Sequence, residues 1–223
     1  MFDVFKSVLV SLAIAVSPTF LSAAVLDFED LSSGAIRTTL LNGVFTPSDS
    51  FANDGFTFFS SHTVYAYGPD NSNDAIPRSG SVFLNTQRAG SNTDPVSLSF
   101  EQTDGSLFNV DSLRIAEGRA SNFSSFASTA LQFTGVRANG ETVSYLYQFD
   151  GIADSDPSID FEAVSLHGFE NLSFFTMTGV GGANDGYSFS VDDISVSAVP
   201  LPAGLIFMLS SVFGLGLLGR RTL

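Results

Sequence analysis

The sequence predicts an all-β protein: an antiparallel β-sandwich, jelly-roll-like, between an amino-terminal signal peptide and a carboxyl-terminal hydrophobic helix. Apolar and polar side chains alternate in short runs, which is the period of a strand with one buried face. Clusters rich in glycine, asparagine and aspartate separate these runs at the spacing typical of sandwiches and jelly rolls. The chain also has 23 phenylalanines and neither cysteine nor tryptophan, which indicates a core of packed aromatic rings without disulfides.

Residues 1–24 have the order of a signal peptide. Lys6 precedes the apolar run 8–16, and small side chains follow at 22–24. A positive region, a short apolar region and small residues are what signal peptidase recognises, so we expect cleavage after Ala24. The alternative is a permanent membrane helix, but about ten apolar residues are too few to span roughly 30 Å of hydrocarbon.

Residues 25–198 are expected to form a single domain, because this length buries roughly 70% of the unfolded surface. The alternating runs that predict its strands are Val96-Leu98-Phe100, Val143-Tyr145-Tyr147-Phe149 and Tyr187-Phe189-Val191. Turn-forming clusters lie between them at 68–74, 139–140 and 179–186. Helical signal is weak throughout this part of the chain.

This domain is more acidic than the whole chain, whose net charge is −14. Of the 23 acidic residues only Asp3 lies outside 25–198, and of the 9 basic residues Lys6, Arg220 and Arg221 lie outside it. The domain therefore holds 22 acids and 6 arginines, a net charge of −16. A nucleic-acid partner is excluded, because phosphate binding requires cations that displace counterions. The acidity favours solubility and divalent cations.

The last segment, residues 199–223, has three parts. Val199, Pro200, Leu201, Pro202 and Ala203 come first, a Gly/Leu-rich apolar stretch follows to 218, and Arg220 and Arg221 close it. As a helix, the 16 apolar residues from 203 to 218 would cover about 24 Å. That length is marginal for a permanent span and adequate for a transient one. The two arginines predict a cytoplasmic carboxyl end and an exported domain.

This tripartite tail resembles the VPLPA variant of the PEP-CTERM sorting signal, because the pentapeptide at 199–203, the apolar spacing and the basic end match together. The resemblance covers about 25 residues. It implies recognition by an exosortase-type membrane protease in Gram-negative bacteria. It also implies release or transfer of the domain to the cell surface or an exopolysaccharide matrix. The alternative is an ordinary tail anchor.

Two acidic pairs are the candidate metal ligands. Asp27 and Glu29 lie on the polar face of the first expected strand. Asp192 and Asp193 interrupt the apolar alternation of the last expected strand, as a bulge would. If the two strands are neighbours, the four carboxylates meet and offer the oxygen ligands that Ca²⁺ prefers. The alternative is that they are separate, solvated carboxylates.

Tyr65 and Tyr67 are the candidate carbohydrate-binding residues. They lie two apart on one face of an expected strand, next to the Asn/Asp-rich segment 68–74. Sugars pack against exposed aromatic rings on a sheet face. The alternative is that both are half-buried strand residues with their hydroxyls at the surface.

No catalytic motif is evident, and we expect the protein not to be an enzyme. His62 and His167 are the two histidines, and neither lies in a metalloprotease or nucleophile-elbow motif. A glycosidase needs two carboxylates about 5–9.5 Å apart, and the available glutamates are Glu101, Glu117, Glu141, Glu162 and Glu170.

The sequence therefore predicts an exported, non-enzymatic surface or extracellular-matrix protein that is membrane-anchored at least transiently. Its expected partners are signal peptidase, the exosortase-type protease and an exopolysaccharide. The alternative is a carbohydrate-binding module stabilised by Ca²⁺, and a third hypothesis is a weak glycosidase.

Overall fold

The structure is a computed structural model that describes residues 23–33, 43–45, 50–68, 80–87, 94–118, 127–150, 161–181 and 188–199. Within these ranges the chain forms 13 strands and one helical turn. The elements are β1 (Ala23–Leu26), α1 (Asp30–Ser33), β2 (Gly43–Phe45), β3 (Ser50–Asn53), β4 (Phe56–Ser60), β5 (Thr63–Tyr67), β6 (Phe83–Gln87), β7 (Ser97–Gln102), β8 (Phe108–Glu117), β9 (Ala130–Arg137), β10 (Thr142–Gln148), β11 (Glu162–Ser165), β12 (Leu172–Val180) and β13 (Ser188–Ala198).

Every strand pairing in this part of the chain is antiparallel, which confirms the predicted class. The strands form two layers. The first layer has the order β2-β5-β6-β13-β8, with β1 also on β13 and β11 on β8. The second layer has the order β3-β4-β7-β12-β9-β10. A single residue pair, Leu172 with Phe108, joins the layers, so the sheet curls over on itself.

Aromatic rings fill the space between the two layers of strands. Phe56 of β4 lies 5.3 Å from Phe108 of β8, edge to face, and these two rings belong to opposite layers. Phe100 of β7 packs tilted against Phe108 at 5.5 Å. Phe28, just after β1, meets Phe58 of β4 at 5.6 Å. The phenylalanines therefore form the core of a domain that has no cysteine and so no disulfide bonds.

Strand β13 is the centre of the first layer and carries a bulge. One of its edges pairs with β6 through residues 188–191 and with β1 through residues 194–197. Its other edge pairs with β8, where the register shifts between Asp192 and Ser195. Asp193 has a positive φ of 47° at that point, so the predicted bulge is confirmed. The first and last strands are neighbours, which meets the condition under which the two acidic pairs would lie close together.

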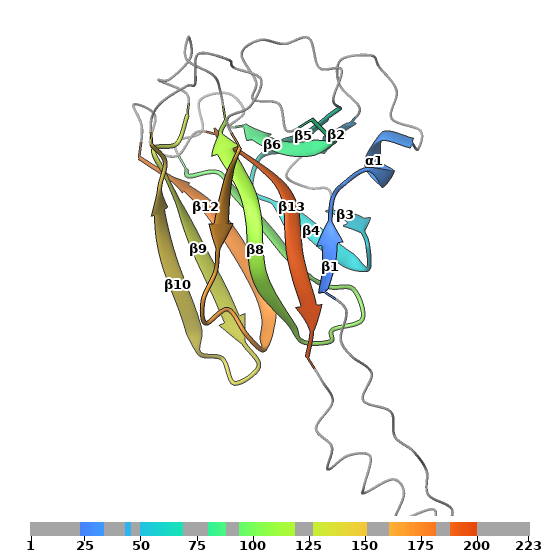
Figure 1. Cartoon of the computed structure of the whole chain (residues 1–223), viewed down its shortest axis with the longest axis vertical. Coiled ribbons are helices and arrows are strands. Elements are labelled where there is room, and N and C mark those ends of the chain that lie inside the picture. Colours follow the sequence, from blue (N-terminus) through green and yellow to red (C-terminus); the bar gives the residue numbers. More distant parts are fainter. Residues whose placement is uncertain are drawn as a thin grey trace, which may run out of the picture.

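The two ends of the described part of the chain lie side by side, with β1 next to β13 (Figure 1). Ala23 pairs with Ser197, and Ala24 pairs with Val196. Cleavage after Ala24 would therefore remove two of the four paired residues of β1. Residues 1–22 and 200–223 lie outside the described residues. Nearly all of the expected signal peptide falls in the first range. The expected hydrophobic helix and the sorting-motif residues from Pro200 to Arg221 fall in the second. Among the described residues, no helix is long and apolar enough to cross a membrane.

Candidate functional site

Tyr65 and Tyr67 lie on one face of β5, and their rings are stacked with centroids 5.9 Å apart. The Tyr67 ring also stacks on the Phe83 ring of β6, with centroids 5.8 Å apart. The Phe161 ring packs edge to face against Phe83. Tyr67 is 7% exposed, whereas Tyr65 is half-buried. The pair therefore shares a face as expected, but only Tyr65 presents part of its ring to a ligand.

The four expected metal ligands divide between two environments. Glu29 accepts a hydrogen bond from the backbone N–H of Val82 at 2.9 Å. The fully buried Asp192 accepts one from the Ser81 hydroxyl at 2.7 Å. Glu29, after β1, and Asp192 of β13 thus hold the adjacent residues just before β6.

The expectation that Asp27 and Glu29 lie on the polar face of the first strand is wrong. That strand, β1, ends at Leu26, and Phe28 has a positive φ of 60°.

The other two carboxylates of this set face elsewhere. Asp193 forms an ion pair with Arg114 at 3.3 Å, and both side chains are about one-third exposed. Asp27 accepts a hydrogen bond from the backbone N–H of Glu29 at 3.1 Å. The structure therefore brings Glu29 and Asp192 to one place, and gives Asp27 and Asp193 other hydrogen-bonding roles.

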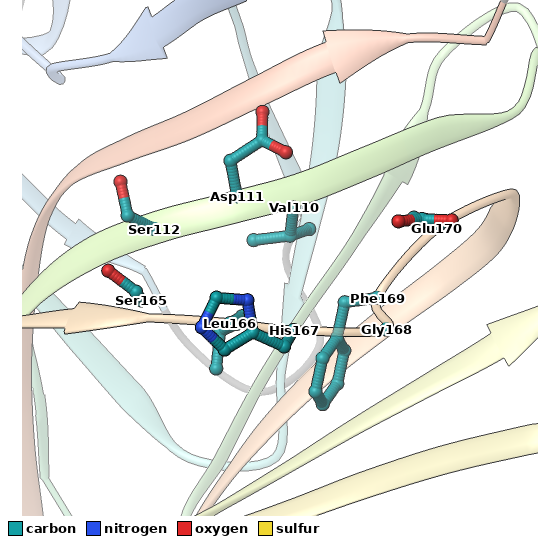
Figure 2. A pocket seen from close by; sticks show the side chains of 9 residues that line it. All are labelled: Val110, Asp111, Ser112, Ser165, Leu166, His167, Gly168, Phe169 and Glu170. Carbon is teal, nitrogen blue, oxygen red and sulfur yellow. The ribbon is translucent and has the colours of Figure 1, made fainter.

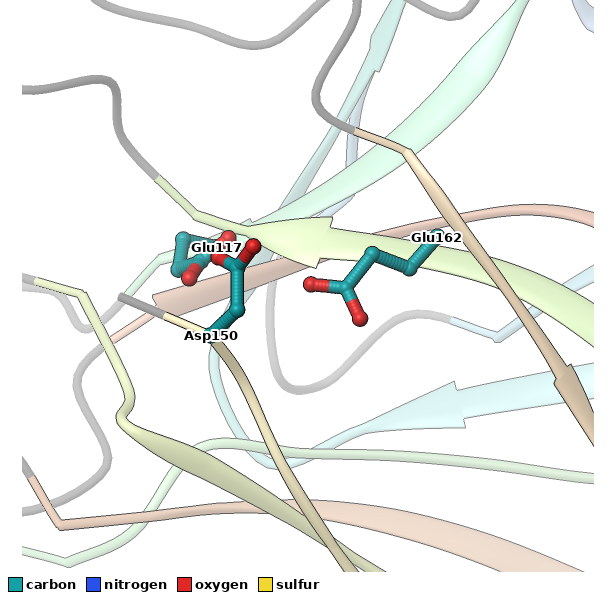
Figure 3. Close-up of side chains that lie close together, drawn as sticks. All are labelled: Glu117, Asp150 and Glu162. Atoms are coloured by element: carbon teal, nitrogen blue, oxygen red, sulfur yellow. The ribbon is translucent and has the colours of Figure 1, made fainter. Parts of the chain in front are cut away.

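A different set of carboxylates lies close together at one end of the sandwich. Glu117 at the end of β8, Asp150 after β10 and Glu162 at the start of β11 each offer an oxygen within 4.8 Å of the others (Figure 3). Glu117 is buried, Asp150 is exposed, and Glu162 is intermediate. Of the five glutamates considered for glycosidase chemistry, the structure brings Glu117 and Glu162 into this group.

Tyr147 of β10 donates a hydrogen bond to Glu162 in the same group. Burial raises the pKa of the Tyr147 phenol well above its usual value, and the hydrogen bond to Glu162 and its negative charge act in the same direction. The phenol therefore stays protonated and keeps its role as a donor. One oxygen of Glu162 is satisfied in this way, while its Oε1 is buried without a hydrogen-bond partner among the described residues.

An open hollow of about 360 Å³ lies on the solvent side of the first layer, between β8 and the connection from β11 to β12. This volume is at the lower end of the roughly 300–1,000 Å³ of small-molecule sites. Its lining residues are Val110, Asp111, Ser112, Ser165, Leu166, His167, Gly168, Phe169 and Glu170. Figure 2 shows Asp111 and Ser112 on β8, and His167 and Glu170 on the facing connection.

A bulge in β8 and backbone hydrogen bonds hold the hollow in shape. The register of β8 against β13 shifts at Asp111, which is the extra residue there, and bulges re-aim side chains in this way. The Asp111 carbonyl accepts a hydrogen bond from Leu166 N–H at 2.8 Å, and Val110 N–H donates to the Phe169 carbonyl at 3.0 Å. Arg137 donates to the Gly168 carbonyl at 2.8 Å. The polar side chains that line the hollow are therefore attached to backbone segments that these hydrogen bonds hold in place.

The chemistry of the hollow is that of a hydroxyl-binding surface. Asp111, His167 and Glu170 are exposed at its sides, while Leu166 and Phe169 are buried beneath them. Carboxylates accept short, charge-assisted hydrogen bonds from hydroxyl groups. An imidazole both donates and accepts. Sequence reasoning did not find this hollow, because its two sides lie more than 50 residues apart and no local motif marks them.

Comparisons with known proteins give partial overlaps only. No protein-family model matches the chain, and no curated protein matches it. A carbohydrate-binding domain, CpGH89CBM32-5 from Clostridium perfringens in complex with GalNAc-β-1,3-galactose, overlaps 52% of this chain and 75% of its own, with 10% identity and a TM-score of 0.36. An F5/8 type C domain from Bacteroides fragilis overlaps 69% of this chain and 97% of its own, with 9% identity and a TM-score of 0.39.

A third solved structure, an arabinose-bound GH51 α-L-arabinofuranosidase, overlaps 78% of this chain and 29% of its own, with 16% identity and a TM-score of 0.39. At these TM-scores neither the ligand nor the site of any of these proteins transfers to this chain. The functional argument therefore rests on the geometry of the described residues.

Proposed function

We propose that the domain is a non-catalytic, glycan-binding module of an exported surface or matrix protein, and that the hollow beside β8 is its binding site. The observation that carries this proposal is that Asp111, His167 and Glu170 line one open depression whose backbone is held by hydrogen bonds. Two carboxylates and an imidazole offer acceptors and donors for the hydroxyl groups of a sugar.

The charge of the domain narrows the ligand class. With a net charge of −16 over residues 25–198, the field around the hollow repels uronic acids, sulfated sugars and phosphate groups. A neutral or amino sugar avoids that repulsion. The site is shallow, so we assign it to a terminal or short glycan segment.

Replacing Asp111 and Glu170 together with alanine is expected to weaken glycan binding by about 100-fold or more, because two hydrogen bonds to charged groups are lost. Each such hydrogen bond contributes about 1.5–3 kcal/mol, and 1.4 kcal/mol corresponds to tenfold. The measurement is titration calorimetry against ligands first identified with the wild-type domain on an array of neutral, amino and acidic glycans.

The matched control for this pair is Asp54→Asn, which removes an exposed carboxylate in the β3–β4 turn of the second layer, whereas the hollow lies on the first layer. It should bind like the wild type. If the wild-type domain binds no glycan on the array, the proposed function is wrong. If binding is present and unchanged in the double variant, the hollow is not the site.

The calcium proposal concerns the junction of the first and last strands. It is supported by Glu29 and Asp192, which approach adjacent residues, and by the complete burial of Asp192, since a buried carboxylate needs compensation. Addition of EDTA is expected to lower the melting temperature, and excess Ca²⁺ to restore it, because an ion bound only by the folded state stabilises it. Glu29→Gln should abolish the response.

Glu117→Gln is the informative second variant in the calcium experiment. A response that persists in Glu29→Gln and disappears in Glu117→Gln would move the ion to the group of Glu117, Asp150 and Glu162. A melting temperature that does not respond to EDTA would refute the calcium proposal.

Delivery is the second part of the proposed function, and it is supported by the tail at 199–203 with Arg220 and Arg221. Protein recovered from its native cells is expected to lack residues 1–24 and the tail, through signal peptidase and an exosortase-type protease. The Arg220→Ala/Arg221→Ala variant should keep the tail. The measurement is intact mass; a wild-type protein that also keeps its tail would mean a plain membrane anchor.

A further inference from the structure

The solvent-facing side of the second layer forms a broad, nearly uncharged surface, which we call the outer face. Its strands are β3, β4, β7, β12, β9 and β10. Inward residues such as Phe58, Phe100 and Phe175 are fully buried. The residues between them in sequence point to the other side, because successive side chains of a strand alternate.

Hydroxyl side chains line up across the outer face. Thr176 of β12 pairs with Ser99 of β7 on one side and with Thr134 of β9 on the other. Thr134 in turn pairs with Ser144 of β10. The row therefore crosses four strands at about 4.8 Å per strand. The Ser99 and Thr176 hydroxyls are 3.0 Å apart, which fixes their rotamers within the row.

A second row runs parallel to the first. Ser97 pairs with Thr178, Thr178 with Gln132, and Gln132 with Leu146. All of these side chains are exposed or half-buried. The outer face thus presents a two-dimensional array of donors and acceptors, because each hydroxyl and amide can do both.

The placement of charge sets this face apart from the rest of the domain. Among its described outward residues, Glu101 is the one that carries a charge, in a domain whose net charge is −16. Ordinary protein surfaces are about 25–35% charged. The first layer, by contrast, carries Asp111, Arg114 and Asp193 on its solvent side.

We propose that the outer face binds the surface of a neutral, unbranched polysaccharide. An uncharged, flat hydroxyl array complements a flat polymer whose own surface is hydroxyl groups, and it avoids the repulsion that an acidic domain imposes on anionic polymers. The face lacks the basic residues that anionic lipids or nucleic acid require. Its exposed apolar residues are Phe59, Val180 and Leu146, on β4, β12 and β10. The Phe59 ring contacts the Phe174 ring with centroids 6.3 Å apart, so one aromatic pair lies beside the hydroxyl rows and can pack against a sugar ring.

This inference shares the glycan class with the proposed function but uses a different surface and a polymeric ligand. The hollow lies on the first layer, and the outer face on the second. A substitution on one of these surfaces leaves the other surface unchanged. An experiment can therefore refute one proposal without refuting the other.

The test is co-sedimentation of the full domain with microcrystalline cellulose, a neutral unbranched polymer, beside alginate gel as an anionic one. We expect binding to cellulose and none to alginate. Thr176→Lys, at the centre of the array, should weaken cellulose binding by about tenfold or more, because a strongly hydrated ammonium group must lose water against an uncharged ligand. Thr176→Ser keeps the hydroxyl and should bind like the wild type.

Two controls make the result decisive. Ala138→Lys adds the same charge in the β9–β10 turn, off the array, and should not weaken binding. Thermal unfolding of each variant shows whether the fold is kept. Cellulose binding that is absent, or that survives Thr176→Lys, overturns the inference. Binding that is lost in the Asp111/Glu170 double variant but kept in Thr176→Lys assigns the polymer to the hollow instead.

Discussion

Replacing Phe100 with alanine is expected to lower the free energy of unfolding by about 3–5 kcal/mol, the usual cost of removing a buried aromatic ring. Phe100 is fully buried, and its ring lies 5.1–5.7 Å from the rings of Phe56, Phe58, Phe108 and Phe175. These neighbours belong to both layers, so the cavity opens at the centre of the sandwich. Since the free energy of unfolding of a whole domain is about 5–15 kcal/mol, this one substitution removes a large part of the stability. Urea denaturation of the wild type and the variant measures the difference.

Phe59→Ala is the matched control for Phe100→Ala. Phe59 is 37% exposed on the outer face, one residue along β4 from the buried Phe58. Its removal deletes the same side chain but opens no cavity, so the loss should be well below half of that for Phe100. Equal losses in the two variants would contradict the assignment of Phe100 to the shared core.

The second large effect is expected at Asp192, the buried carboxylate in the bulge of β13. Alanine there removes the acceptor for the Ser81 hydroxyl at 2.7 Å and for the Asp193 N–H at 2.9 Å. Hydrogen bonds to a charged group contribute about 1.5–3 kcal/mol, and a donor left buried without an acceptor costs about 1–3 kcal/mol. We expect a loss of about 2–3 kcal/mol in the free energy of unfolding, measured by urea denaturation.

Asp192→Asn separates hydrogen bonding from charge at this position. The amide oxygen can still accept from the Asp193 N–H, and the amide NH2 can donate to the Ser81 hydroxyl, which then acts as the acceptor. The variant should therefore retain most of the stability. Losses as large as those of the alanine variant would contradict the hydrogen-bond account. They would show instead that the negative charge is needed, which is the result that a bound cation at this junction would produce.

The strand pattern of the sequence predicts the structure well where strands are central. The runs around Val96–Phe100 and Phe189–Val191 became β7 and β13, with their apolar residues buried as expected. The run that starts at Val143 also became a strand, β10, and its alternating residues share one face of the sheet as expected. Tyr145 is nevertheless 45% exposed, because β10 pairs with β9 alone and lies at the edge of the second layer. Periodicity fixes which side chains share a face, but burial depends on where the strand lies in the sheet.

Carboxylate positions were predicted less well than strands. The bulge at Asp192 and Asp193 follows from the local pattern and is present. The pairing of the first and last strands is also present, but it depends on strand order, which the local pattern does not give. The prediction that all four carboxylates meet is wrong, because Asp193 forms an ion pair with Arg114 of β8 instead. No sequence pattern places an arginine opposite a bulge.

The local signals in this chain, which are alternation, turn clusters and a bulge, are enough to predict an antiparallel sandwich with a phenylalanine core, while export, predicted from the two apolar ends, stays a prediction. They act between neighbours along the chain, where the pleat and the backbone dihedrals impose them directly. The hollow beside β8, the group of Glu117, Asp150 and Glu162, and the hydroxyl rows of the outer face join residues from strands far apart in sequence. Their contacts are set by strand order and register, which depend on how two sheets pack around one core, and that is a property of the folded molecule alone.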